Sequence, residues 1–115
     1  MRTLLLFGGI LFGAALPAGA HHALASEFKT GQMITLTGMV TKVEWSNPHA
    51  RLYVEAKTGG DVMKWDFEMA SPNLLTLQGW KIDTFRRGDR VTVEGYPSRD
   101  GSNHAYATKV AKTAP

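Results

Sequence analysis

The chain has 115 residues and a molecular mass of 12.6 kDa, with no cysteine, four histidines and a formal net charge of +3. This length allows one domain at most. The absence of cysteine excludes disulfides, thiolate zinc sites, iron–sulfur clusters, cysteine nucleophiles and cysteine-linked lipid anchors. The positive charges are scattered, whereas nucleic-acid binding needs a concentrated basic surface, so we expect no nucleic-acid partner.

Residues 1–20 have the layout of a secretory signal peptide. A single positive charge near the start precedes an apolar stretch from Leu4 to Leu16, and small residues flank the expected cleavage after Ala20. A second site of the same type would allow cleavage after Ala25. The apolar stretch is shorter than the roughly 20 residues that span a bilayer, so we expect no membrane anchor after cleavage. The sequence therefore predicts a periplasmic or secreted protein.

The rest of the chain divides into three parts. We expect an N-terminal arm at residues 21–32, a β-domain at residues 33–111 and a frayed tail at residues 112–115. Cleavage at the first site would leave His21 as the new N-terminus, followed at once by His22. An N-terminal histidine can chelate a divalent ion through its α-amine and its ring, and copper(II) heads the affinity order for such ligands. A mobile terminus without function is the alternative.

The β-domain shows patterns for five strands and one helix. In the first strand, residues 33–45, the apolar residues change parity between Val40 and Val43, which indicates a bulge or bend near residues 38–42. Alternation of apolar and polar residues predicts further strands over residues 49–57, 62–69, 90–96 and 104–111. A capping serine, a proline at the first helical position and a closing glycine predict a short helix over residues 71–79.

This order of elements predicts a mainly β protein. Three meander strands, one short helix and two further strands form the order of a small five-stranded OB-fold-like barrel, with the helix between strands three and four. A six-stranded roll or an open sheet with one helix is the alternative. In an OB-fold, the loops before strands two and five lie at the same end of the barrel, beside the binding face. His49 and His104 follow these two loops, so they could lie near one another.

The candidate site residues form two overlapping sets. The set for copper or another divalent metal is His21, His22 and His49, and the set for an organic ligand is Trp45, Asn47, His49, Arg51, Arg99 and His104. The two arginines are suited to an anionic group on such a ligand. Each histidine also has an ordinary interpretation, because His49 could bond a backbone carbonyl and His104 could be a solvated loop residue.

A pair of acidic residues also lies on one strand. Asp66 and Glu68 share a face of the predicted strand, about 7 Å apart, which is a spacing that catalytic carboxylates also have. Because no partner base is evident, we interpret both as residues of a solvated outer face. The sequence contains no G-x-S-x-G, H-E-x-x-H or phosphate-loop motif, so we expect a binding protein and no enzyme.

Several motifs together resemble a known family. They are His21-His22-Ala23 after the leader, Glu27-Phe28, Trp45-Ser46-Asn47-Pro48-His49, Gly79-Trp80 and Gly88-Asp89-x-Val91. The chain resembles a family of small exported bacterial proteins of unknown function, which have a double histidine after the signal peptide and a W-x-N-P-H motif. This resemblance covers nearly all of the mature chain and singles out His21, His22, Asn47 and His49, but it implies no activity.

Taken together, these features predict an exported periplasmic binding protein whose mature N-terminal histidines bind copper or another divalent metal. The alternative is an OB-fold module that binds a small ligand, a glycan or a protein without metal. The sequence indicates no particular protein partner.

Overall fold

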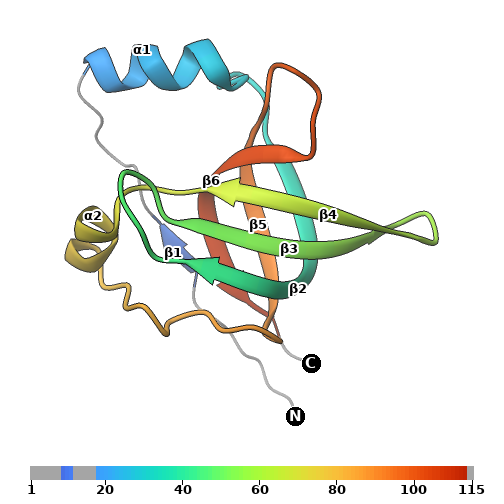
Figure 1. The fold of residues 1–115 in the computed structure, drawn as a ribbon. Helices are drawn as coiled ribbons and strands as arrows, with labels where there is room; N and C mark the ends of the chain where they lie inside the picture. Colours follow the sequence, from blue (N-terminus) through green and yellow to red (C-terminus); the bar gives the residue numbers. More distant parts are fainter. Residues whose placement is uncertain (1–8, 12–17, 114–115) are drawn as a thin grey trace.

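The computed structural model describes residues 9–11 and 18–113. The elements of this part are β1 (Gly9–Leu11), α1 (Ala18–Glu27), β2 (Ile34–Glu44), β3 (Arg51–Thr58), β4 (Asp61–Glu68), α2 (Pro72–Leu77), β5 (Arg90–Pro97) and β6 (His104–Lys112). Figure 1 shows β2 to β6 wrapped into a barrel, with α1 lying across one end. Residues 1–8 and 12–17 of the predicted leader, and residues 114–115 of the predicted tail, lie outside the described part.

The barrel strands follow one another in the order β6-β4-β3-β2-β5, and β5 pairs back with β6 to close the barrel. Four of these pairings are antiparallel, while β4 and β6 run parallel. The short α2 lies between β4 and β5 in the chain. These findings confirm the predicted five-stranded OB-fold-like barrel with a helix between its third and fourth strands. In addition, β1 pairs antiparallel with the last part of β6.

A bulge at Thr41 bends β2, the first strand of the barrel. The register with β3 shifts immediately after Val40, which confirms the predicted position of the bulge. Val40 is buried before the shift, and Val43 packs against the core after it. Gly38 pairs with both β3 and β5, and a Cβ atom there would collide with the backbone oxygen of Glu55. A glycine at this position therefore lets β2 pair closely with both neighbouring strands.

The interior of the barrel is filled by apolar side chains from every barrel strand. Phe67 is fully buried and stacks on the partly buried Trp65, with ring centroids 5.9 Å apart, as expected for the inward face of this strand. At the start of α2, Leu74 donates its backbone N–H to the hydroxyl of Ser71 at 3.2 Å, and Leu75 is buried in the core. Neither helix in the described part is long and apolar enough to cross a membrane.

The helix α1 occupies much of the segment that the sequence predicts as an N-terminal arm. Immediately after it, Phe28 is only 1% exposed, and its ring centroid lies 5.2 Å from that of His104 and 5.8 Å from that of Tyr106. Arg99, in the loop between β5 and β6, donates from Nε to the carbonyl oxygen of Ala25 at 2.8 Å. These contacts hold α1 beside the end of the barrel where β4 finishes and β6 begins.

Candidate functional site

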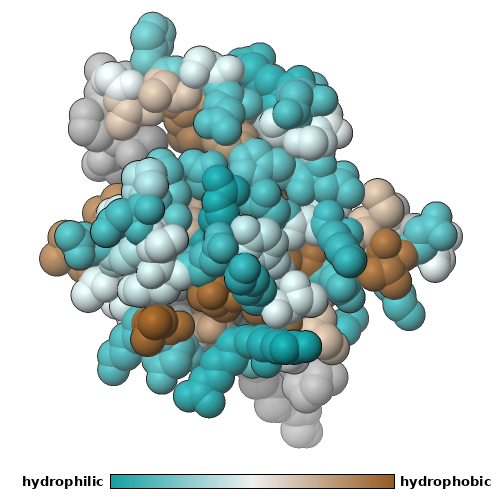
Figure 2. Space-filling view, in the orientation of Figure 1, coloured by the Kyte–Doolittle hydropathy of each residue, from teal (hydrophilic) through white to brown (hydrophobic). Residues whose placement is uncertain are grey.

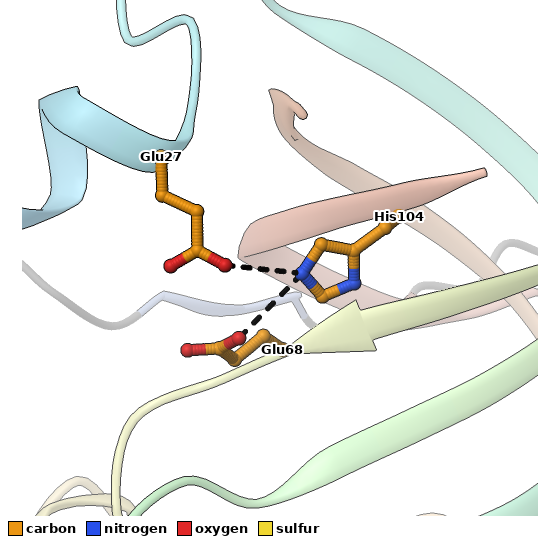
Figure 3. A group of neighbouring side chains, drawn as sticks. All are labelled: Glu27, Glu68 and His104. Atoms are coloured by element: carbon orange, nitrogen blue, oxygen red, sulfur yellow. Dashed lines mark ion pairs between the residues drawn. The ribbon is translucent and has the colours of Figure 1, made fainter. Parts of the chain in front are cut away.

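Three side chains from three elements converge beside α1. Glu27 ends α1, Glu68 ends β4 and His104 begins β6, and Figure 3 shows the two carboxylates approaching the same nitrogen of the histidine. The Nε2 atom of His104 lies 3.8 Å from Oε2 of Glu27 and 3.6 Å from Oε1 of Glu68. One ligand atom from each of the three residues lies within 4.8 Å of the others. Glu68 is 7% exposed, whereas Glu27 faces solvent.

The second oxygen of Glu68 faces another histidine. Nε2 of His49 lies 3.5 Å from Oε2 of Glu68. Nδ1 of the same ring lies 2.8 Å from the backbone oxygen of Met69. Because a carbonyl oxygen only accepts, Nδ1 carries the proton that is donated to it, and in the neutral ring Nε2 keeps its lone pair. The structure thus brings His49 and His104 to the two oxygens of one carboxylate.

The other nitrogen of the His104 ring faces an acidic residue. Its Nδ1 atom lies 3.1 Å from Oδ1 of Asp66, which is the register partner of His104 in the parallel pairing of β4 and β6. The angle falls outside hydrogen-bond geometry, and Nδ1 is buried without a hydrogen-bond partner among the described residues. Asp66 also accepts a hydrogen bond from Nη1 of Arg51 at 2.8 Å. A metal-bound histidine usually donates its second ring N–H to a carboxylate, a backbone carbonyl or water, and here Asp66 lies within ion-pair distance of that nitrogen without making this hydrogen bond.

The distances around Glu68 suit ligands that share an ion. Charge-assisted hydrogen bonds between such groups are about 2.7–2.9 Å long. The contacts of His49 and His104 with the two glutamates are longer, at 3.5, 3.6 and 3.8 Å. An ion with tetrahedral bonds of about 2.1 Å has ligand atoms about 3.4 Å apart. The two distances from Nε2 of His104 to the glutamates are close to this value, and imidazole and carboxylate ligands together suit divalent transition metals.

A pocket of about 350 Å³ lies next to these residues, between α1 and the barrel. Glu27, His49 and Glu68 belong to its wall, and the rest of the wall is mostly apolar, with Leu24, Phe28, Pro48 and Leu74 among its members. Figure 2 shows apolar surface where α1 meets the barrel, on a face that is otherwise largely hydrophilic. Tyr106 also lines the pocket, and burial together with the negative charge of Glu68 raises the pKa of its hydroxyl.

Four residues of the predicted organic-ligand set lie outside this cluster or are engaged in other contacts. Arg51 forms ion pairs with Asp66 and Glu68, so its charge is already balanced. Arg99 is bonded to the end of α1. Trp45 packs against the hydrophobic core. The fourth, Asn47, is exposed before its cis peptide bond to Pro48.

The double histidine lies in α1. His22 is exposed, and it does not belong to the ligand group formed by Glu27, Glu68 and His104 in the described part of the chain. The side chain of His21 lies outside the described part. Glu27 lies six positions after His21 in the helix, which is about 9 Å along the helix axis. A chelate at the N-terminus and an ion at Glu27 would therefore be separate sites while this helix is intact.

The interpretation of Glu68 as a solvated residue is wrong. Alternation with Phe67 and Met69 does direct Glu68 away from the barrel interior, but the side chains of His49, Arg51 and His104 gather around this outer position, which also lines the pocket. The sequence did contain one indication of this site, because Asp66 and Glu68 lie on the same face of one strand. Glu27 gave no such signal, because its role depends on a helix in a segment with the pattern of a polar arm.

Comparisons with known proteins identify the family and the fold of this chain. A model for a family described as "Family of unknown function (DUF6152)" matches residues 10–107. No curated protein matches the chain. Among solved structures, the crystal structure of the mitochondrial single-stranded DNA binding protein Rim1 from S. cerevisiae is similar, with a TM-score of 0.52 and 11% identity. The match covers 70% of this chain and 93% of that one, and at this identity it shows the fold alone.

Proposed function

This chain belongs to the DUF6152 family of unknown function, and on that premise we propose that it is an exported protein that binds a divalent metal ion between α1 and the barrel. The observation that carries this proposal is the convergence of Glu27, Glu68 and His104 within 4.8 Å. Export is supported by the signal-peptide layout of residues 1–20. We propose binding and no catalysis, since the surrounding residues include no activated nucleophile of a familiar type.

Each residue of the cluster has a distinct role in this proposal. His104 supplies Nε2, and the two glutamates supply one oxygen each. His49 lies at the second oxygen of Glu68, where it can join the ion or hold the carboxylate in place. Asp66 faces the remaining nitrogen of His104 and would orient its ring.

Copper(II) is the ion that we expect to bind most tightly at this site, because it heads the affinity order of divalent first-row metals for nitrogen and oxygen ligands. The mature N-terminus offers a second copper site. After cleavage behind Ala20, the α-amine and ring of His21 could chelate an ion, with His22 beside them. The helical separation from Glu27 keeps this chelate distinct from the pocket site.

A competition titration with copper(II) or zinc(II), on the exported protein with its natural N-terminus, tests both sites. We expect Glu68→Gln and His104→Gln to weaken the pocket site by about 100-fold or more, since each removes a ligand atom. Glu55→Gln on β3 is the matched control and should bind as the parent does. An added residue ahead of His21 should weaken only the N-terminal chelate. Parental binding by both pocket variants would rule out the pocket site.

The metal-free alternative is an OB-fold module for an organic ligand, a glycan or a protein. The apolar pocket supports an organic ligand more than the other two, because its walls are concave and enclosed by α1. Rim1 is named as a single-stranded DNA binding protein, but we do not extend that activity to this chain. Here the charge of Arg51, at the start of β3, is balanced by Asp66 and Glu68.

A further inference from the structure

We infer that the pocket beside α1 binds a small apolar molecule with one anionic group, and that this group coordinates the metal ion. This inference rests on the proposed metal site and names the class of ligand that would complete it. It joins two features that the structure places together, a cluster of metal-binding atoms and an apolar cavity.

The cavity and the cluster share residues. Glu27 and Glu68 belong to the group that could hold the ion, and both also line the pocket. An ion bound by these carboxylates would therefore lie at the pocket wall. His104 approaches from β6, and its ring packs against Phe28, which is itself a pocket residue. A ligand in the pocket would thus be within reach of the ion.

The protein supplies fewer ligand atoms than such an ion normally takes. The cluster offers three, from Glu27, Glu68 and His104, while His49 lies at the other oxygen of Glu68 and in this inference holds that carboxylate in place. Sites with three protein ligands keep a further position for water or for an exchangeable ligand. Because two of the three residues line the cavity, an exchangeable ligand would enter from the cavity.

The charges favour an anionic group at this position. A divalent ion balances the carboxylates of Glu27 and Glu68, so the loaded site would not repel a monoanion. Asp66 adds no uncompensated charge, because Arg51 pairs with it at 2.8 Å. Without the ion, the same two carboxylates would repel an anion, so binding should depend on the metal.

The remaining wall sets the shape of the ligand. Ala23 and Leu24 lie on the same face of α1 as Glu27, and Ala20, which continues this stripe, is removed by the expected cleavage. Pro48, Ala70 and Leu74 belong to the opposite part of the wall. The volume of about 350 Å³ is at the small end of ligand pockets. An aromatic or short aliphatic acid fits these walls better than a glycan, whose hydroxyl groups would lack partners.

Benzoate is a suitable probe, and cobalt(II) is a suitable ion because its visible spectrum reports its ligands. The protein is first loaded with cobalt(II) and then titrated with benzoate, with acetate and with benzyl alcohol. We expect benzoate to change the cobalt spectrum and to bind at least about tenfold more tightly than acetate, which lacks the apolar ring. Benzyl alcohol, which lacks the anionic group, and benzoate with metal-free protein should give no saturable binding.

A variant that fills the pocket separates the cavity from the metal site. Ala23→Trp places a large ring on the pocket-facing side of α1, at a position that is exposed and so tolerates the change. We expect it to abolish benzoate binding and to leave the cobalt affinity within about twofold of the parent. Ser26→Trp, at an exposed position of α1 outside the pocket wall, is the matched control and should keep both activities.

The outcomes distinguish the two proposals. If the parent protein binds no cobalt, both the metal site and this inference fail. If cobalt binds but benzoate leaves its spectrum unchanged, the metal site stands and the inference is wrong. Equal benzoate binding by metal-free and loaded protein, or by the Ala23→Trp variant and the parent, would also overturn the inference.

Discussion

Nε2 of His104 lies 3.6 Å from Oε1 of Glu68, although these residues are 36 positions apart in the chain. The contact depends on the parallel pairing of β4 and β6, which aligns His104 with Asp66, two residues before Glu68. The same pairing places Asp66 behind the other nitrogen of the ring. One strand pairing therefore brings together a pair of candidate ligands and places a carboxylate next to the other ring nitrogen of one of them.

Asp66→Asn should weaken metal binding by about 10–100-fold, because replacing the carboxylate that faces Nδ1 reduces the basicity and the orientation of the His104 ring. The affinity would be measured by competition with a chromophoric chelator. Asp61→Asn, at the exposed start of the same strand, is the control and should have no effect. Parental affinity in Asp66→Asn would show that Asp66 does not support the site.

Arg99→Gln should loosen α1 from the barrel, since the variant loses the hydrogen bond from the guanidinium to the carbonyl of Ala25. We expect faster amide hydrogen exchange in α1 and weaker metal binding, because α1 carries Glu27. The barrel amides should exchange as before. Arg87→Gln, at an exposed arginine before β5, is the control. Unchanged exchange in α1 would mean that Phe28 and the backbone hydrogen bonds to Pro97 and Arg99 hold the helix without this side-chain contact.

Gly38→Ala should destabilise the barrel by about 1–3 kcal/mol or more, because the added methyl group would collide with the backbone oxygen of Glu55 and with the side chain of Val54. The free energy of unfolding would be measured by urea denaturation. Gly31→Ala is the matched control, because a Cβ atom there meets no atom within 4 Å. Equal stability of the two variants would contradict the close approach of β2 and β3.

Asp100 should titrate at unusually low pH. Its carboxylate accepts hydrogen bonds from the side chain and backbone of Ser102 and from the hydroxyl of Ser98, and these lower its pKa from 3.8 to about 2. The folded-state pKa is thus below the unfolded value, so the stability that Asp100 contributes is present above pH 4 and is lost as the pH falls towards about 2. Carbon-detected NMR would follow the carboxyl group directly.

Ser102→Ala should raise the pKa of Asp100 towards its usual value, since it removes the largest contribution to the shift. Thr113→Ala, at the residue that follows β6, is the control and should leave the titration unchanged. A midpoint near pH 4 in the parent protein would show that these hydrogen bonds do not persist in solution.

The strand pattern could be predicted because it depends on local alternation. Residues of β3 and β5 alternate between core and exterior, and the change of parity after Val40 marks a bulge that the register confirms. The Ser71-Pro72 start of α2 is likewise a local capping signal. The candidate site could be predicted only in part from local patterns, because it joins residues from three separated segments of the chain.

The sequence by itself determined the alternation of the strands, the bulge, the short helix and the placement of His49 and His104 after two loops at one end of the barrel. Only the tertiary structure decided that Glu68 is buried and that Glu27 lies opposite His104. The physical reason is that alternation fixes which way a side chain leaves its strand, whereas burial depends on what covers it. Here Glu68 contacts the side chains of His49, Arg51 and His104, which come from other segments of the chain.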